Sequence, residues 1–278
     1  MEEREMEMTK GSWMVAMAIL GIAACAPAPA PQAATTRAVE VAGTPVIAPA
    51  RADTLGDDIV IRHLAGRIWL HVTLSPDANR IPSNGLLVDE GDGVLLIDTA
   101  WDDEQTGRLA EWSLRRLGKP IRRSISTHFH DDRLGGIDTL RALGIDARAL
   151  DLTVSKAREK GKASLPAIYM TVAQRARMDP AGFEVFHPGP GHSPDNIVVW
   201  FPAEGVLFGG CFVKGAESRD LGNLSDADVG RWPASVAAVL DRYPRASIVI
   251  PGHGAPGGLN LLSHTTALLA APAHNGGG

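Results

Sequence analysis

Four short polar segments of this 278-residue chain contain side chains of the types that bind metal ions in proteins. Imidazole, thiolate and carboxylate groups are ligands of zinc and other borderline metals. The segments are STHFHDDRLGG (126–136), GPGHSPDN (189–196), GGCFVKG (209–215) and PGHG (251–254). The candidate ligands within them are His128, His130, Asp132, His192, Cys211 and His253. This combination predicts a metal centre.

The spacing in the first segment supports that prediction. Only Phe129 separates His128 from His130, so both imidazoles can point at one ion in a tight loop, with Asp132 beside them. Glycines near the later candidates allow sharp turns and close backbone approach. A lone histidine is more often a structural or surface residue, so the hypothesis depends on the combination of segments.

The N-terminus has the features of an export signal. Residues 11–24 form an apolar run that is short for a membrane span, and Lys10 precedes it. The run ends in IAAC (22–25), which is typical of a bacterial lipoprotein signal in which Cys25 carries the lipid. An ordinary signal peptide with a cysteine at this place by chance is the alternative.

These features predict three parts of the chain and a location. We expect a lipoprotein signal peptide over residues 1–24, a Pro/Ala-rich tether over 25–56 and a folded domain over 57–278. The protein would then be a periplasmic monomer, anchored to the outer membrane only through the lipid on Cys25. The net charge of −5 argues against a broad basic surface for nucleic acid.

Cys211 is the second of only two cysteines, so it has no disulfide partner in the chain if Cys25 is lipidated. An unpaired thiol in an oxidising compartment needs an explanation. Cys211 is either a small buried apolar residue, a metal ligand or a nucleophile.

The hydrophobic pattern predicts an α/β protein in which helices cover β-sheets. The polar segments follow predicted strands, where sites on such scaffolds usually lie. We expect a loop over 75–84 and a hairpin over 85–99. The other expected strands are 58–63, 67–73, 121–126, 183–189, 196–202, 205–210 and 246–254. The expected helices are 102–118, 135–144, 151–161, 225–244 and 257–270.

Taken together, these segments resemble the metallo-β-lactamases, specifically subclass B1, which has a cysteine in its second zinc site. The resemblance rests on HFHDD, GPGHSPDN, GGCFVK, LGNLSDAD and PGHG, with SNGLLV and LLIDTAW upstream. It extends from about Asp57 to Leu269. It implies an αβ/βα sandwich of two β-sheets flanked by helices, with the metals at one edge.

The resemblance also implies two Zn²⁺ per subunit. It assigns the first zinc to His128, His130 and His192, and the second to Asp132, Cys211 and His253. Cys211 would then be a zinc thiolate.

The implied activity is hydrolysis of the β-lactam amide of penicillins, cephalosporins and carbapenems by metal-bound hydroxide, which confers antibiotic resistance. Asp132 would orient the water, Asn223 would stabilise the oxyanion, and Lys214 would bind the substrate carboxylate. Asp98 would interact with a zinc ligand without binding the metal itself. Solvated loop residues are the alternative for Lys214 and Asn223, and a strand-end cap is the alternative for Asp98.

Other interpretations remain open at this stage. Related thioesterases and lactonases usually carry H-x-H-x-D-H, whereas this chain has Arg133 at the last position. Arg133 either pairs with Asp131 or lies beneath the second zinc. Trp101 either lines the pocket or belongs to the core. A zinc-binding lipoprotein without catalytic activity is the remaining alternative.

Overall fold

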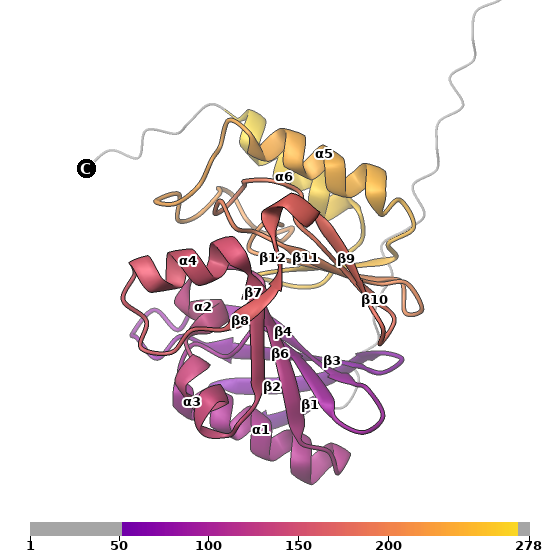
Figure 1. Cartoon of the computed structure of the whole chain (residues 1–278). Coiled ribbons are helices and arrows are strands. Elements are labelled where there is room, and N and C mark those ends of the chain that lie inside the picture. The colour runs from indigo at the N-terminus through magenta and orange to yellow at the C-terminus, as the bar shows by residue number, and fades with distance from the viewer. Residues whose placement is uncertain (1–51, 272–278) are drawn as a thin grey trace, which may run out of the picture. The chain divides into compact units, whose positions relative to one another are not determined.

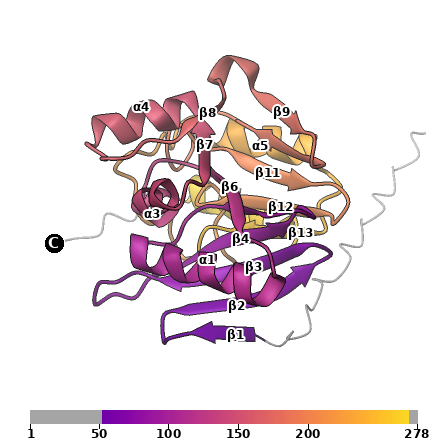
Figure 2. The same ribbon diagram turned by 60° about the horizontal axis from the view of Figure 1, so that its bottom comes forward.

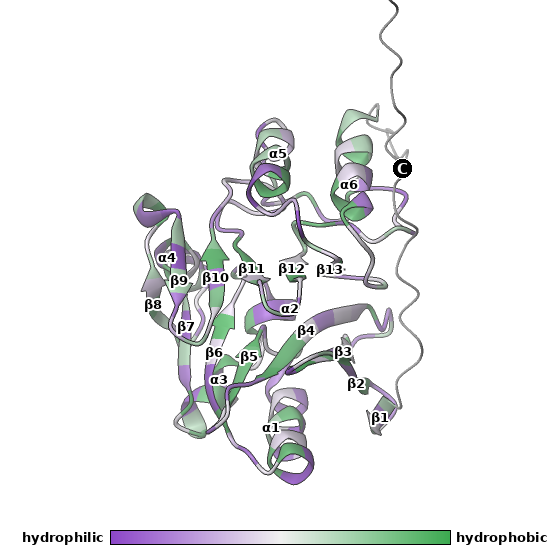
Figure 3. Ribbon diagram, turned by 90° about the vertical axis from the view of Figure 1, so that its right-hand side faces the viewer, coloured by the Kyte–Doolittle hydropathy of each residue, from purple (hydrophilic) through white to green (hydrophobic). Residues whose placement is uncertain are grey.

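The computed structural model describes residues 52–271 of the chain. Two β-sheets face each other, and helices cover their outer surfaces (Figure 1). In Figure 3 the helices α5 and α6 lie above one sheet and α1 lies below the other. The predicted αβ/βα sandwich is confirmed. Residues 1–51, which include the expected signal peptide and Cys25, lie outside the described part.

The first sheet contains eight strands in the order of the sequence. They are β1 (Ala52–Leu55), β2 (Ile59–Ala65), β3 (Ile68–Leu74), β4 (Pro82–Asp89), β5 (Val94–Ile97), β6 (Ile121–Ser126), β7 (Asp146–Leu150) and β8 (Ala167–Met170). The pairs from β1 to β5 are antiparallel, and those from β5 to β8 are parallel. The helices between these strands are α1 (Asp103–Leu117), α2 (Asp131–Leu134), α3 (Ile137–Ala142) and α4 (Asp151–Glu159).

The second sheet has five strands in the order β13-β12-β11-β10-β9. They are β9 (Ala176–Asp179), β10 (Phe183–Phe186), β11 (Val198–Phe201), β12 (Val206–Gly210) and β13 (Ile248–Pro251). A 3₁₀ turn, η1 (Val172–Gln174), precedes β9, and the helices α5 (Trp232–Arg242) and α6 (Asn260–Ala270) flank β13 in sequence. Figure 2 shows the strands of both sheets from another side.

Alternation of buried side chains along the strands produces three apolar layers. The layer between the sheets includes Leu86 and Ile97 from the first sheet and Phe201 from the second. A second layer lies beneath α1 around Trp112, and a third lies beneath α5 around Val236. All four residues of β5 are buried because both faces of that strand are covered.

Local sequence signals explain the ends of α1. The side chain of Asp102 accepts a hydrogen bond from the backbone N–H of Gln105, and Gly118 ends the helix in the left-handed region at φ 69°. Ser, Thr, Asp and Asn are favoured at the N-terminal cap because their side chains accept hydrogen bonds from free N–H groups of the first turn. Glycine is favoured at the C-terminal end because, without a Cβ, it adopts the left-handed conformation at little cost. This helix is confirmed close to its expected bounds of 102–118.

Three expectations for other elements need correction. Residues 52–55 lie in the segment expected as tether, but they form β1 and pair with β2. The loop expected over 75–84 is shorter, because Pro82 begins β4. The helix expected over 225–244 begins only at Trp232, with Pro233 in its first turn, where proline needs no N–H partner.

The short strands β7, β8 and β9 and the helix α2 were absent from the expected elements. Each strand has only four or five residues, too few to show a clear alternation, and β7 and β9 also carry charged side chains. Pairing with neighbouring strands makes them part of the sheets. Within residues 52–271, no helix has the length and apolar character needed to cross a bilayer.

Candidate active site

All six candidate ligands lie where a strand has ended or a helix begins. His128 follows β6, His130 precedes the first residue of α2, and Asp132 lies in that helix. The other three come from the second half of the chain. His192 lies between β10 and β11, Cys211 follows β12, and His253 follows β13. Both sheets therefore contribute to one place.

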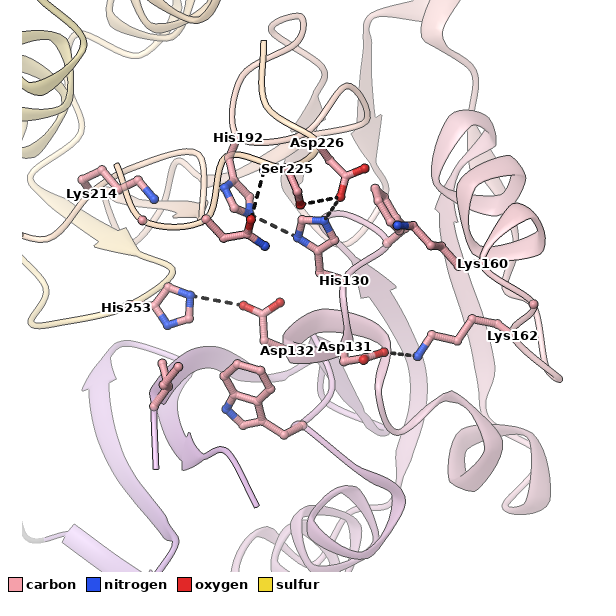
Figure 4. Close-up of a pocket in the computed structure, with 16 residues that line it drawn as sticks. His130, Asp131, Asp132, Lys160, Lys162, His192, Lys214, Ser225, Asp226 and His253 are labelled. Carbon is pink, nitrogen blue, oxygen red and sulfur yellow. Dashed lines mark hydrogen bonds and ion pairs between the residues drawn. The ribbon is translucent and has the colours of Figure 1, made fainter. Parts of the chain in front are cut away.

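These segments surround a cavity of about 740 Å³. In Figure 4, His130, Asp132, His192 and His253 point towards a common centre. Three other regions line the cavity besides these ligands. Ile81 and Trp101 form an apolar wall, Lys214 and Asn223 lie on another side, and the loop after α4 lies on a third. Of the two positions considered for Trp101, the pocket wall is therefore the observed one.

The first ligand group consists of His128, His130 and His192. The distance from His128 Nε2 to His130 Nδ1 is 3.0 Å, and the distance from His130 Nδ1 to His192 Nε2 is 3.2 Å. Burial lowers the pKa of His128 well below its usual range, and burial lowers that of His192 to about 3. Both imidazoles are therefore neutral and have a lone pair for a cation.

The second group brings Cys211 together with Asp132 and His253. The Cys211 Sγ atom lies 3.2 Å from Asp132 Oδ2 and 3.2 Å from His253 Nε2, and the last two atoms are 3.3 Å apart. The Nδ1 atom of His253 is 2.6 Å from the carbonyl oxygen of Pro82, which directs Nε2 towards the cavity. These contacts place a thiol, a carboxylate and an imidazole around one point.

The spacing of both groups suits zinc. Nitrogens at about 2.0–2.1 Å from one tetrahedral zinc ion are about 3.3–3.4 Å apart, and pairs that include sulfur are slightly farther apart. The observed separations of 3.0 to 3.3 Å are within a few tenths of an ångström of these values. Nitrogen, sulfur and carboxylate oxygen are also the donor types that zinc takes. The residues therefore fit the metal.

Asp132 and His253 show the electrostatic character of the second group. Burial alone would raise the pKa of Asp132, but Arg133 and His253 lower it well below its usual range. Burial likewise disfavours a charged His253, but the adjacent Cys211 and Asp132 raise its pKa to about 10. Cys211 and Asp132 therefore favour a positive charge at the position of the His253 ring.

Arg133 lies completely buried beneath the second group. Its Nη2 atom is 2.9 Å from Cys211 Sγ and 3.0 Å from Asp132 Oδ2, and it donates to the carbonyl of Gly252 at 3.0 Å. Asp131 pairs with Lys162 instead. Of the two positions considered for Arg133, the one beneath the ligands is therefore the observed one.

Asp98 links Arg133 to the segment that carries His128. Its carboxylate accepts hydrogen bonds from the backbone N–H of Thr127 at 2.6 Å and from the Thr127 hydroxyl at 2.8 Å. Arg133 Nη1 lies 3.4 Å from the same carboxylate. Burial raises the pKa of Asp98 to about 7, although Arg133 opposes this shift. Asp98 thus fixes the residue before His128, and within residues 52–271 it forms no hydrogen bond with a candidate ligand.

Lys214 and Asn223 both line the cavity, as the sequence predicts. Lys214 is only 8% exposed, and burial lowers its pKa. No carboxylate of residues 52–271 lies within ion-pair distance of its ammonium, which lies 5.5 Å from the centre of the Trp232 ring. A buried cation without an anion favours an anionic ligand. Asn223 is exposed, and its Oδ1 accepts from the N–H of Ser225 at 3.0 Å.

Asp226 is a site residue that the sequence did not single out. Its Oδ2 atom lies 3.1 Å from His130 Nε2, on the far side of the ring from the ligand nitrogen. Burial opposes ionisation, but the hydrogen bond from His130 lowers the pKa of Asp226. Asp226 therefore orients the His130 ring and fixes its tautomer. It lies in LGNLSDAD, yet no spacing links it to a histidine 96 residues away.

Comparison with known proteins agrees with this geometry. The family model described as the metallo-beta-lactamase superfamily matches residues 78–253. A metallo-beta-lactamase type 2 of Bacillus cereus is 40% identical over 212 residues, which are 76% of this chain and 82% of the relative. One of Bacteroides fragilis is 36% identical over 217 residues, which are 77% of this chain and 87% of the relative.

Solved structures give the same result. The mono-zinc form of the metallo-beta-lactamase FIM-1 from Pseudomonas aeruginosa superimposes with a TM-score of 0.71 at 37% identity. The match covers 76% of this chain and 95% of FIM-1. A metallo-beta-lactamase from Pontibacter korlensis has a TM-score of 0.72 at 36% identity and is covered completely, with 77% of this chain. The chain therefore belongs to the metallo-beta-lactamase superfamily and, within it, to the type 2 enzymes of subclass B1.

Proposed function

We propose that this protein hydrolyses the amide bond of β-lactams with the help of zinc. The observation that carries the proposal is the pair of adjacent ligand groups along a cavity that the buried side chain of Lys214 also lines. Relatives named metallo-beta-lactamase support the same reaction. Penicillins, cephalosporins and carbapenems are the proposed substrates, and resistance to them is the proposed consequence.

The chain would hold two zinc ions. His128, His130 and His192 would hold one, and Asp132, Cys211 and His253 would hold the other. Zinc supplies Lewis acidity and lowers the pKa of a coordinated water to near neutrality. Because FIM-1 is known in a mono-zinc form, the second ion is the one whose occupancy needs measurement.

The remaining residues position the substrate and the water. Lys214 binds the carboxylate next to the lactam nitrogen, which pairs its otherwise isolated charge. Asn223 donates its amide N–H to the carbonyl oxygen as negative charge develops there. Asp132 accepts a hydrogen bond from the attacking water and directs it at the carbonyl carbon. Asp98, Arg133 and Asp226 keep the ligands in place.

Hydrolysis of a carbapenem, a penicillin and a cephalosporin by the purified protein tests the proposal. We expect turnover that EDTA abolishes and added zinc restores, because the proposed reaction needs the Lewis acidity that zinc supplies. Zinc binding without turnover of any β-lactam would contradict the substrate assignment. Nitrocefin and S-lactoylglutathione then separate a lactamase from a thioesterase, and turnover of neither would favour a protein that only binds zinc.

We further propose that the protein is a periplasmic monomer that a lipid on Cys25 anchors to the outer membrane. The apolar run, the IAAC motif and the Pro/Ala-rich tether support this proposal. We expect Cys25→Ala to move the protein from the membrane fraction to the soluble periplasmic fraction, because one thiol carries the anchor. A Cys211→Ala variant is the matched control and should stay in the membrane fraction. An unchanged distribution for Cys25→Ala would exclude the anchor.

A further inference from the structure

The wall of the cavity opposite Lys214 carries two more lysines. Lys160 and Lys162 line the same cavity from the end of α4. In Figure 4 they lie on one side of His130 and Asp132, whereas Lys214 lies on the other side. Positive charge therefore lies at both ends of the space in which a substrate would bind.

The helix end fixes the position of these lysines. The N–H of Lys162 donates to the carbonyl of Ala157 at 3.1 Å, and the N–H of Gly161 donates to that of Arg158 at 3.0 Å. With φ of 74° at Gly161, these bonds form a Schellman motif, which only a residue tolerant of the left-handed region allows. Lys160 and Lys162 are therefore held at a rigid helix end and do not belong to a long loop.

The two lysines differ in their partners. The ammonium of Lys162 contacts the carboxylate of Asp131, so its charge is compensated. The ammonium of Lys160 lies 5.6 Å from the centre of the Phe129 ring, and within residues 52–271 it forms no ion pair. Asp226 is the carboxylate whose pKa responds to Lys160, but it already binds His130 and Ser225. Lys160 is therefore the cation that remains available.

The shape of a β-lactam connects this cation to function. In penicillins the ring carboxylate and the acylamino substituent leave opposite sides of the bicyclic nucleus. If Lys214 holds the carboxylate, the acylamino substituent extends away from it, past the ligands and towards Lys160. We propose that Lys160 forms a second anion subsite, which binds an acidic group on the acylamino substituent. This inference rests on the proposed β-lactamase function.

The consequence is a preference among substrates. A β-lactam with a second carboxylate on its acylamino side would use Lys214 and Lys160 together, whereas one with a neutral side chain would use Lys214 alone. The Phe129 ring beneath Lys160 holds the ammonium over the cavity through a cation–π contact. Lys160 is thus a specificity residue, and it has no part in the bond-breaking step.

Carbenicillin and benzylpenicillin test this proposal because they differ by one carboxylate on the acylamino side chain. We expect Lys160→Gln in the zinc-loaded full chain to lower the ratio of kcat/KM for carbenicillin to that for benzylpenicillin by about three- to fivefold, as for a partly exposed ion pair. The change should appear in the KM for carbenicillin, because ground-state binding is lost. Raising the salt concentration should lower the wild-type ratio in the same direction.

Two further variants control the result. Lys156→Gln removes a lysine from the same helix that pairs with Glu159 outside the cavity, so the ratio should not change. Asp131→Asn removes the ion-pair partner of Lys162. The second uncompensated ammonium should raise the ratio of kcat/KM for carbenicillin to that for benzylpenicillin. Calorimetry with the two hydrolysed penicillins provides a readout independent of turnover, in which Lys160→Gln should weaken only the carbenicillin product.

The outcomes distinguish failure of the proposed subsite from failure of the proposed β-lactamase function. An unchanged ratio in Lys160→Gln, with benzylpenicillin still hydrolysed by the wild type, would overturn the subsite and leave the proposed function intact. An equal effect of Lys156→Gln would also overturn it, because the effect would then be one of net charge. No turnover of benzylpenicillin by the zinc-loaded wild type would overturn both.

Discussion

Replacing Arg133 by methionine is expected to lower the free energy of unfolding of the zinc-free protein by about 3–5 kcal/mol. Arg133 is completely buried, and its guanidinium contacts Cys211, Asp132 and Asp98 at 2.9 to 3.4 Å. Methionine fills a similar volume but leaves two buried carboxylates without their cation. The cost of an unpaired buried charge therefore dominates the result.

The effect should also depend on pH. Burial already raises the pKa of Asp98 to about 7 with Arg133 present, and loss of Arg133 raises it further. A carboxyl group whose pKa is raised in the folded state destabilises that state more as the pH rises. The unfolded chain then releases the proton that the folded protein retains. The decrease in the free energy of unfolding caused by Arg133→Met should therefore be larger at pH 8 than at pH 6.

Denaturant unfolding with EDTA present measures this prediction. Arg115→Met is the matched control, because Arg115 forms only an exposed ion pair with Glu111 and should cost less than about 1 kcal/mol. Arg133→Lys keeps the positive charge but loses the planar set of guanidinium donors. Its decrease in the free energy of unfolding should therefore lie between those of Arg133→Met and Arg115→Met. A loss below about 1 kcal/mol for Arg133→Met would mean that the site tolerates its unpaired carboxylates.

Cys211→Ala is expected to reduce kcat/KM for β-lactams by about 100-fold or more and to remove one of the two zinc ions. Loss of a residue that merely supports a ligand costs about 10- to 100-fold in metal affinity or activity, and Cys211 is placed as a ligand itself. Its sulfur lies 3.2 Å from both other members of its group, so its loss removes one of the three donors around that point. His128, His130 and His192 are untouched and should retain the first ion.

Metal analysis of the protein together with rates at a fixed zinc concentration gives both readouts. Cys25→Ala removes the other cysteine of the chain and provides the control, with two zinc ions and full activity expected. Cys211→Ser should behave like Cys211→Ala, because a neutral hydroxyl is a much weaker zinc ligand than a thiolate. Two zinc ions in Cys211→Ala would show that Cys211 is a buried thiol outside the coordination shell.

Features that depend on a few neighbouring residues could be predicted from the sequence. Asp102 and Gly118 delimit α1 because capping depends on neighbouring residues. The H-x-H-x-D spacing places His128, His130 and Asp132 within five consecutive residues, and each of them belongs to a group of candidate ligands. The other ligands were identified because each follows a strand in a glycine-containing segment, and resemblance to the metallo-β-lactamases then predicted the sandwich.

Contacts between segments far apart in the chain became known only from the folded structure. β1 is a strand because it pairs with β2, although its four residues have no clear pattern of their own. Arg133 lies beneath Cys211, and Asp226 orients His130, across 78 and 96 residues of chain. Lys160 reaches the cavity because α4 ends there. Local periodicity and capping carry no information about which distant side chains meet, since packing of the two sheets sets those distances.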